Sequence, residues 1–152
     1  KGIKKVCIKS GIRYDHASPE YLKEVVLNHV YDNLKIAPEH VNKDVLRLMN
    51  KDKGNLKKFI HYFNSLKSGK KLSFYFMTAH PGSGVKEAEE LAEAIKNLKN
   101  AEAVQVFTPT PMTVSTCMYY TGMDPKTKKK VKIPYTYLEK KVQKRFVLKN
   151  AN

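Results

Sequence analysis

Short apolar runs alternate with amphipathic stretches along this chain, and polar residues close each run. The runs lie at residues 6–8, 34–37, 72–77 and 104–107, and they predict four buried strands. The clearest is 72–77, which is rich in aromatic residues and ends in a His-Pro-Gly turn. Strands that alternate with helices at this spacing favour parallel pairing with right-handed crossovers, and therefore the α/β class.

Helix start signals follow the predicted strands. Ser18 is a good N-cap with Pro19 at the first helical position, and Asn42 caps a second helix. The stretch from residue 85 to 98 is the clearest helix, because its apolar residues form a single stripe: Val85, Ala88, Leu91, Ala92, Ile95 and Leu98. A further helix is predicted after Gly54.

The regular pattern stops after the fourth run. Residues 108–135 hold four prolines and a Gly-Met-Asp-Pro turn signal. They predict a functional loop or a tail that packs elsewhere, with a small hairpin between 118–121 and 131–133. Thr136 and Glu139 then form a capping box that starts a final helix. We expect the inward face of this helix to be formed by Leu138, Val142 and Phe146.

The polar clusters at the strand ends are the candidate functional segments, at 10–15, 37–40, 78–82 and 108–111. The carboxyl ends of parallel strands converge on one rim, where barrels and open sheets place their chemistry. Glu39 at this rim would accept hydrogen bonds from ligand hydroxyl or ammonium groups, or would serve as a charge at a helix N-terminus.

Other residues of these clusters have two readings each. Arg13 and Asp15 are close enough in sequence to pair with each other. His40 and His80 are candidate bases or metal ligands, but each taken alone is more often a turn or capping residue. Gly82 offers backbone N–H groups to an anion or a heterocycle, although the turn lacks the GK[ST] ending of a phosphate loop.

The charge balance is strongly basic and comes almost entirely from lysine. The formal net charge is +15, from 29 basic and 14 acidic residues, and arginine occurs only at Arg13, Arg47 and Arg145. Lysine lacks the planar fork used for bidentate phosphate or guanine contacts. Because the lysines are spread along much of the chain, a solvated basic surface is favoured over a dedicated nucleic-acid face.

Cysteine content and hydropathy narrow the possible classes of protein further. Cys7 and Cys117 are more than a hundred positions apart, so neither a zinc site nor a disulfide framework fits, and no metal site is predicted. No apolar stretch approaches the roughly 20 residues that span a bilayer. We therefore expect a cytoplasmic protein without a membrane partner.

Three long motifs, in order, carry a family resemblance. They are LKIAPEHVNKDVLRLMNKD, FYFMTAHPGSGVKEAEELAEAI and VQVFTPTPMTVSTCMYYTGMDP, with SGIRYD upstream. Together they closely resemble the YgiQ-type family of radical S-adenosylmethionine (SAM) proteins. The resemblance implies the later part of a partial (β/α)6 TIM-like radical SAM barrel, with four β/α units in residues 1–107 and a C-terminal loop and helix in 108–152.

The resemblance also implies the cofactors of the intact protein, which are SAM and a 4Fe-4S cluster. In such enzymes three thiolates of a CxxxCxxC loop hold the cluster, and the cleaved cofactor gives a radical that abstracts hydrogen from the substrate. This chain lacks that loop, so we expect the fragment alone to be inactive and to bind no cluster. The catalytic residues and the substrate are not implied.

Family roles transfer to particular positions of this chain. Glu39 and Lys51 match residues that meet the cofactor, and Arg13 with Asp15 matches a contact to its ribose or carboxylate. His80, Pro81 and Gly82 match the turn that borders the adenine, and Thr108 matches the neighbouring rim. Substrate-facing positions would be Ser115, Thr116, Tyr119 and Tyr120.

Two other classes stay open at this point. The charge permits a basic nucleic-acid-binding α/β module, whose binding would fall steeply with added salt. A self-contained flavodoxin-like enzyme is disfavoured by the missing phosphate loop. An arc of a barrel would also expose strand edges, so we expect self-association or an edge covered by the last helix.

Overall fold

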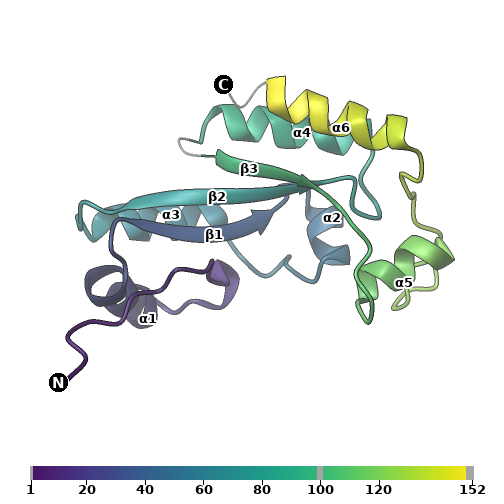
Figure 1. Cartoon of the computed structure of the whole chain (residues 1–152). Coiled ribbons are helices and arrows are strands. Elements are labelled where there is room, and N and C mark those ends of the chain that lie inside the picture. Colours follow the sequence, from purple (N-terminus) through teal and green to yellow (C-terminus); the bar gives the residue numbers. More distant parts are fainter. Residues whose placement is uncertain (1, 99–100, 150–152) are drawn as a thin grey trace.

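A computed structural model describes residues 2–98 and 101–149 (Figure 1). Its sheet has three parallel strands in the order β1-β2-β3, at Asn33–Glu39, Lys71–Thr78 and Ala101–Val106. The described helices are η1 (Tyr14–His16), α1 (Pro19–Glu24), η2 (Val25–His29), α2 (Lys43–Leu48), α3 (Leu56–Ser65), α4 (Val85–Lys96), α5 (Val114–Thr121) and α6 (Tyr137–Lys149). The α/β class with parallel pairing is thus confirmed, and closure into a barrel stays a prediction.

The predicted strand at residues 6–8 is wrong. Val6 is exposed, and the Ile8 N–H donates to the His29 carbonyl rather than to a strand. The upstream segment pairs with the sheet at Ile12, which forms an isolated parallel bridge with Ile36. A three-residue apolar run flanked by lysines buries too little surface to hold a strand in place. Of the four predicted strands, three are therefore present.

The predicted hairpin at 118–121 and 131–133 is also wrong. Residues 114–121 form α5. Thr113 caps its N-terminus by accepting a hydrogen bond from the Thr116 N–H, and Gly122 ends the helix in the left-handed conformation. Only the bridge between Met123 and Lys130 has antiparallel pairing in this segment. The capped helix satisfies the backbone hydrogen bonds of these residues. The turn signals that predicted a hairpin were weaker than the capping signals of Thr113 and Gly122.

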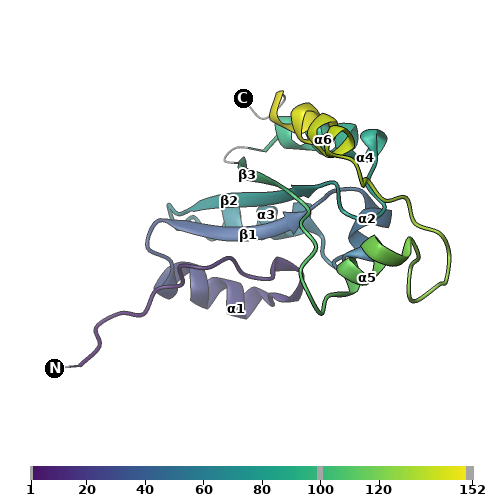
Figure 2. The ribbon, with the colours of Figure 1, turned by 45° about the vertical axis from the view of Figure 1, so that its right-hand side comes forward.

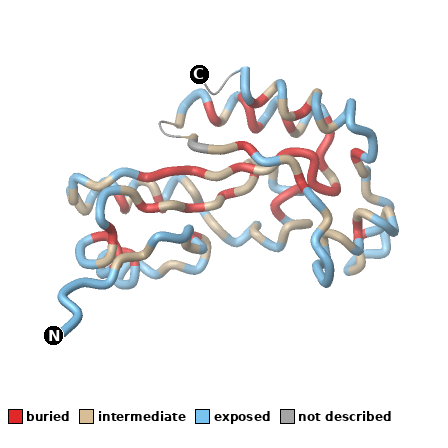
Figure 3. Tube along the Cα trace, viewed as in Figure 1, coloured by how far each residue is buried: buried red, intermediate tan, exposed pale blue. Residues whose placement is uncertain are grey.

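The two faces of the sheet differ in what covers them. Alternate residues of β1 and β2 are buried against helices. They form one hydrophobic core with residues of α1, α3, α4 and α6. The strand members of this core are Leu34, Ile36, Leu72, Phe74 and Phe76. In Figure 1, α3 lies behind the sheet and no helix crosses its front. Figure 3 shows the buried residues concentrated along β2 and between α4 and α6.

The front surface, here called the open face, is partly exposed and carries both polar and apolar side chains. They are Lys35, Ala37, Tyr75, Met77, Ala103 and Gln105. Glu39 follows an irregularity in the β1 register and pairs with Phe76. The Lys35 ammonium lies 5.8 Å from the ring centre of Tyr75 on this face. A sheet face that is neither apolar nor covered by helices is suited to a ligand or to another part of a protein.

The last helix covers the β3 side of the sheet. Helix α6 packs along α4 and contacts β3 and β2, as both ribbon views show (Figures 1 and 2). Its capping box is confirmed, because the Glu139 carboxylate accepts from Thr136 N–H and Thr136 Oγ1 accepts from Glu139 N–H. Its predicted inward face is only partly right, since Gln143 and Val147 are buried while Leu138 is exposed.

Candidate functional site at the strand ends

Glu39 and Lys51 form an ion pair at the carboxyl end of β1. Lys51 Nζ lies 2.9 Å from Glu39 Oε1 and donates a second hydrogen bond of 3.0 Å to the Ala37 carbonyl. Both side chains are mostly buried, with 14% of Lys51 and 21% of Glu39 exposed. Glu39 is not glycine yet has a φ of 67°, a strained conformation that is concentrated at functional sites.

The end of α2 positions Lys51. Asn50 has a φ of 56°, the Asn50 N–H donates to the Arg47 carbonyl, and the Lys51 N–H donates to the Leu46 carbonyl. These two bonds are those of a Schellman motif with Asn50 as the left-handed residue. The chain therefore reverses immediately after α2, and Lys51 returns to the strand end that Glu39 closes.

Arg13 and Asp15 lie beside this pair and bind each other, as one reading of the sequence predicted. The guanidinium of Arg13 holds both carboxylate oxygens of Asp15, and it also donates to the Asn50 carbonyl at 3.4 Å. The Asp15 side chain is buried and the Arg13 side chain is about half exposed. We call Arg13, Asp15, Glu39 and Lys51 the charged cluster.

The charges of the cluster support one another. The hydrogen bond from Arg13 lowers the pKa of Asp15 against the opposing effect of burial, and the bond to Asp15 raises the pKa of Arg13. The negative charge of Glu39 also raises the pKa of Arg13. Two cations and two anions at one rim can bind a zwitterion, since each of its charged groups finds a partner of opposite sign.

His80 lies at the end of β2 and is fully engaged by the protein. Its Nδ1 lies 2.8 Å from the Pro81 carbonyl, which can only accept, so Nδ1 carries the hydrogen and Nε2 accepts from the Ser115 hydroxyl at 2.7 Å. Phe107 packs edge-on to the ring at 5.1 Å. Burial lowers the pKa of His80 to about 4, so the ring is neutral near pH 7 and connects the β2 end to α5.

The glycine turn after β2 does not offer the free amides that its sequence suggested. The Gly82 N–H donates to the Lys132 carbonyl at 2.7 Å, and the Gly84 N–H donates to Glu87 Oε2 at 2.7 Å. Gly82 is required for its conformation, because its φ is 90° and a Cβ there would collide with Leu48. An anion-binding role for these two amides is therefore excluded in this conformation.

The remaining predicted positions divide into engaged and exposed side chains. Thr108 is exposed at the β3 end, and its hydroxyl donates back to the Val106 carbonyl at 3.4 Å. The Thr116 hydroxyl donates to the Thr110 carbonyl, and Tyr119 packs among Phe107, Tyr120 and Tyr135. Of the predicted substrate-facing residues, Tyr120 is the most open, with 74% of its surface exposed.

Sequence reasoning missed Gln143, which organises the turn after β2. Its side-chain oxygen accepts from the Ala79 N–H at 3.0 Å and the Ser83 hydroxyl at 2.8 Å, and its amide nitrogen donates to the Ser83 carbonyl. Its side chain is buried although the residue is polar. The available signal was its position four residues before the buried Val147, on the same side of α6.

A second missed residue, Asp124, fixes the segment after α5. It accepts from Arg47 at 2.9 Å and from the Thr127 hydroxyl at 2.8 Å, and the bond from Arg47 is the largest of the effects that lower its pKa to about 2. The sequence indicated a turn at this position but not its partner on α2.

These side chains decide whether the chain can bind a metal ion or a cofactor. Cys7 is half-buried and Cys117 is exposed, and the whole chain has no third cysteine, so the three-thiolate set of a 4Fe-4S cluster does not fit this chain. In residues 2–98 and 101–149, no group of three or more His, Cys, Asp or Glu side chains is arranged to hold a metal ion. The charged cluster does suit the ammonium and carboxylate of SAM, because it presents both signs of charge at one strand end.

A helix that crosses a membrane must be long and apolar. The described helices include none with the length and apolar character that crossing a bilayer requires.

Relatives of known sequence align with almost all of the chain. It is 46% identical over 95% of its length to a UPF0313 protein of Methanocaldococcus jannaschii. UPF0313 proteins of Clostridium botulinum and Clostridium perfringens are 42% and 41% identical over 93% and 94% of the chain. The chain spans only about a quarter of these relatives, at 26%, 24% and 23% of their lengths.

A family model matches the C-terminal part of the chain. It is described as a domain of unknown function, DUF3362, and it matches residues 102–150, from within β3 through α6. The matched segment therefore includes α5 and the helix that covers the β3 side of the sheet.

Proposed function

We propose that this chain is part of a radical SAM enzyme and supplies the strand ends that bind the methionyl group of SAM. The observation that carries the proposal is the Glu39–Lys51 pair, which lies at the carboxyl end of β1 in a parallel sheet. The ordered motifs that resemble the YgiQ-type family give it further support. The relatives that match are about four times longer than this chain, which leaves room for cluster-binding cysteines elsewhere in such a protein.

Each residue of the charged cluster has a definite role in this proposal. The Glu39 carboxylate accepts hydrogen bonds from the ammonium of SAM, and the Lys51 ammonium donates to its carboxylate. The two ligand groups are attached to one carbon, so they require two opposite charges close together, as Glu39 and Lys51 are. Arg13, held by Asp15, adds a half-exposed cation beside them.

When bound, the cofactor and its cluster would supply radical chemistry. The residues of this chain bind and orient the methionyl end and leave the open face to the substrate. His80 is buried and bonded on both nitrogens, so its role is to hold α5 against the sheet rather than to transfer protons. Gly82 and Thr108 remain candidate neighbours of the adenine, whereas His80 is 2% exposed and would act only by positioning the turn.

The test uses the complete protein, of the length of its relatives, reconstituted anaerobically with iron and sulfide. We expect 5'-deoxyadenosine to form from SAM and dithionite, and Glu39→Gln and Lys51→Met to weaken SAM binding by about 10- to 100-fold, as loss of a charge-assisted bond would. The matched control is Glu93→Gln, which breaks a 2.7 Å Glu–Lys pair at an exposed site on α4. Full cofactor cleavage at unchanged SAM affinity in both variants would refute the assignment.

A second candidate function rests on the basic surface of α6. Lysines and one arginine line a groove of about 630 Å³ beside Tyr137, which is exposed: they are Lys140, Lys141, Lys144, Arg145 and Lys149. Cations next to an aromatic ring suit the backbone and bases of single-stranded nucleic acid. Binding of a fluorescent oligonucleotide that falls steeply between 50 and about 200 mM salt would favour this function, provided that SAM has no effect on it.

A further inference from the structure

The segment that follows α5 is a basic loop, residues 122–131, which we call the basic arm. It carries four exposed lysines, which are Lys126, Lys128, Lys129 and Lys130. None of the four has an ion-pair partner within residues 2–98 and 101–149. Asp124 is the only acidic residue of the arm, and it is buried and bonded to Arg47. The arm therefore presents positive charges to solvent without an exposed carboxylate of its own.

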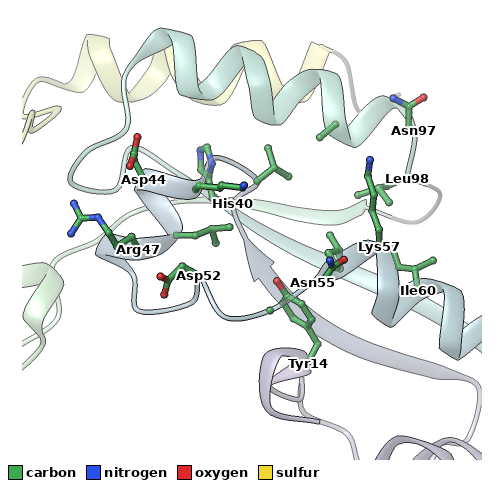
Figure 4. A pocket seen from close by; sticks show the side chains of 16 residues that line it. Tyr14, His40, Asp44, Arg47, Asp52, Asn55, Lys57, Ile60, Asn97 and Leu98 are labelled. Atoms are coloured by element: carbon green, nitrogen blue, oxygen red, sulfur yellow. The ribbon is translucent and has the colours of Figure 1, made fainter. Parts of the chain in front are cut away.

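Hydrogen bonds hold the arm in one shape. The Asp124 N–H donates to the Lys129 carbonyl at 2.9 Å, and the Val131 N–H donates to the Gly122 carbonyl at 2.8 Å, which closes the base of the arm. Figure 4 shows Arg47 at the edge of a pocket beside α2, with its guanidinium extending away from the helix. This guanidinium donates to Asp124 at 2.9 Å and fixes the arm to α2. A loop that is already ordered loses little conformational entropy when it binds a partner.

Two exposed tyrosines flank the arm. Tyr120 in the last turn of α5 is 74% exposed, and Tyr135, four residues after the arm, is 54% exposed. Both rings pack against Tyr119, with ring centres 5.4 and 5.2 Å from its own. In both ribbon views the chain between α5 and α6 runs beside α5 (Figures 1 and 2). Aromatic rings next to cations suit the bases and the backbone of single-stranded nucleic acid.

The arm also borders the charged cluster. Lys126 Nζ lies 3.5 Å from Asn50 Oδ1, and the Asn50 carbonyl accepts from Arg13 at 3.4 Å. Asn50 thus contacts both the arm and the cluster. A partner held by the arm therefore lies beside the strand ends that carry the candidate site.

We propose that the basic arm, together with Tyr120 and Tyr135, binds single-stranded nucleic acid. The lysines contact phosphates and the tyrosines stack on bases. A lysine ammonium is a single charge, which suits phosphate contacts that do not read the base sequence. This surface shares no residue with the α6 groove or with the charged cluster, so the proposal depends on neither function proposed above.

The test measures binding of a fluorescent strand of about ten nucleotides to the complete protein, with no SAM added. The strand is made as RNA and as DNA; binding of either supports the proposal, and the tighter one identifies the nucleic acid. The matched probe is an abasic strand of the same length, which keeps the phosphates but has no bases. We expect it to bind at least about fivefold more weakly, as loss of one stacked base would give.

Two triple variants locate the phosphate contacts. The arm variant carries Lys128→Gln, Lys129→Gln and Lys130→Gln. The slope of log affinity against log salt concentration should become shallower by about 2, because each phosphate contact contributes about 0.7. The control variant carries Lys4→Gln, Lys5→Gln and Lys9→Gln. It loses the same charge from the N-terminal segment, which lies away from α5 in both ribbon views, so its slope should equal that of the original protein.

Tyr120 tests the aromatic part of the surface. Tyr120→Ala should weaken binding about fivefold or more, and Tyr120→Phe should bind like the original protein. The proposal is overturned if the arm variant keeps the original slope or if the control variant changes it as much. It is also overturned if the abasic strand binds as tightly as the strand with bases, since the arm would then bind polyanions in general.

Discussion

Two buried histidines make the stability of this fold sensitive to mild acid. Burial lowers the pKa of both His40 and His80 from 6.5 to about 4. For His40, the carboxylate of Glu87 opposes this effect and His80 adds to it; for His80, the bond to the Pro81 carbonyl opposes it. Both side chains are at most 2% exposed, so neither imidazolium would be hydrated in the folded chain.

The sign of the pH dependence follows from these values. In the unfolded chain each histidine takes up a proton as the pH falls through about 6.5, but in the folded chain it stays neutral until about 4. The unfolded state therefore binds more protons in this window, and folding stability falls as the pH falls. Between pH 7.5 and 5 the loss is about 2 kcal/mol for each histidine and about 4 kcal/mol for both.

A loss of that size is measurable, because a small domain is typically stable by about 5–15 kcal/mol. The assay is urea unfolding of the chain, followed by circular dichroism at pH 7.5, 6 and 5. His40→Gln and His80→Gln should each reduce the change in unfolding free energy by about half. His61→Gln controls for removal of a histidine from the exposed side of α3.

The reasoning fails if the chain is equally stable at pH 7.5 and pH 5. It also fails if both buried-histidine variants keep the full pH dependence of the original chain, since other groups would then account for it.

Two substitutions test how the turn after β2 is held. Gln143→Leu should lower the unfolding free energy by about 3 kcal/mol, because it leaves the buried Ala79 N–H and Ser83 carbonyl without partners; an unchanged urea midpoint would contradict this. Gly82→Ala should cost about 1–3 kcal/mol, because alanine disfavours a φ of 90° and its Cβ meets Leu48. A melting temperature equal to that of the original chain would argue against the strain.

The strands and most helices could be predicted from local signals. The runs at 34–37, 72–77 and 104–107 lie in β1, β2 and β3, because each is apolar enough to be buried on one face of the sheet. Ser18 and Asn42 accept from the N–H groups predicted by the capping rules. Such interactions span only a few residues, so the sequence alone contains the information.

Features that depend on distant partners could not be predicted. Residues 6–8 have the composition of a strand but bond to the backbone and ring of His29, and no local signal distinguishes the two outcomes. Gln143 looks like a surface residue until its partners 60 or more positions upstream are known. The inward face of α6 was predicted from apolar residues alone, and the structure uses a buried amide there.

The candidate site shows the same division. Strand topology predicted that the segments with Arg13, Asp15 and Glu39 lie at one rim, because the carboxyl ends of parallel strands converge. Lys51 was expected there only from the family resemblance, since it follows a helix. The hydrogen bonds of the site were not predictable, since the Gly82 amide is taken by Lys132, fifty residues downstream.

The most direct measurement of the central claim is SAM affinity in the reconstituted complete protein that carries the exchange Glu39→Lys with Lys51→Glu. The exchange keeps two opposite charges in contact but reverses the sign that each ligand group meets. If the pair binds the methionyl group, SAM affinity should fall at least about 100-fold. If the pair is only structural, the exchanged protein should bind SAM as tightly as the original, and the assignment would be wrong.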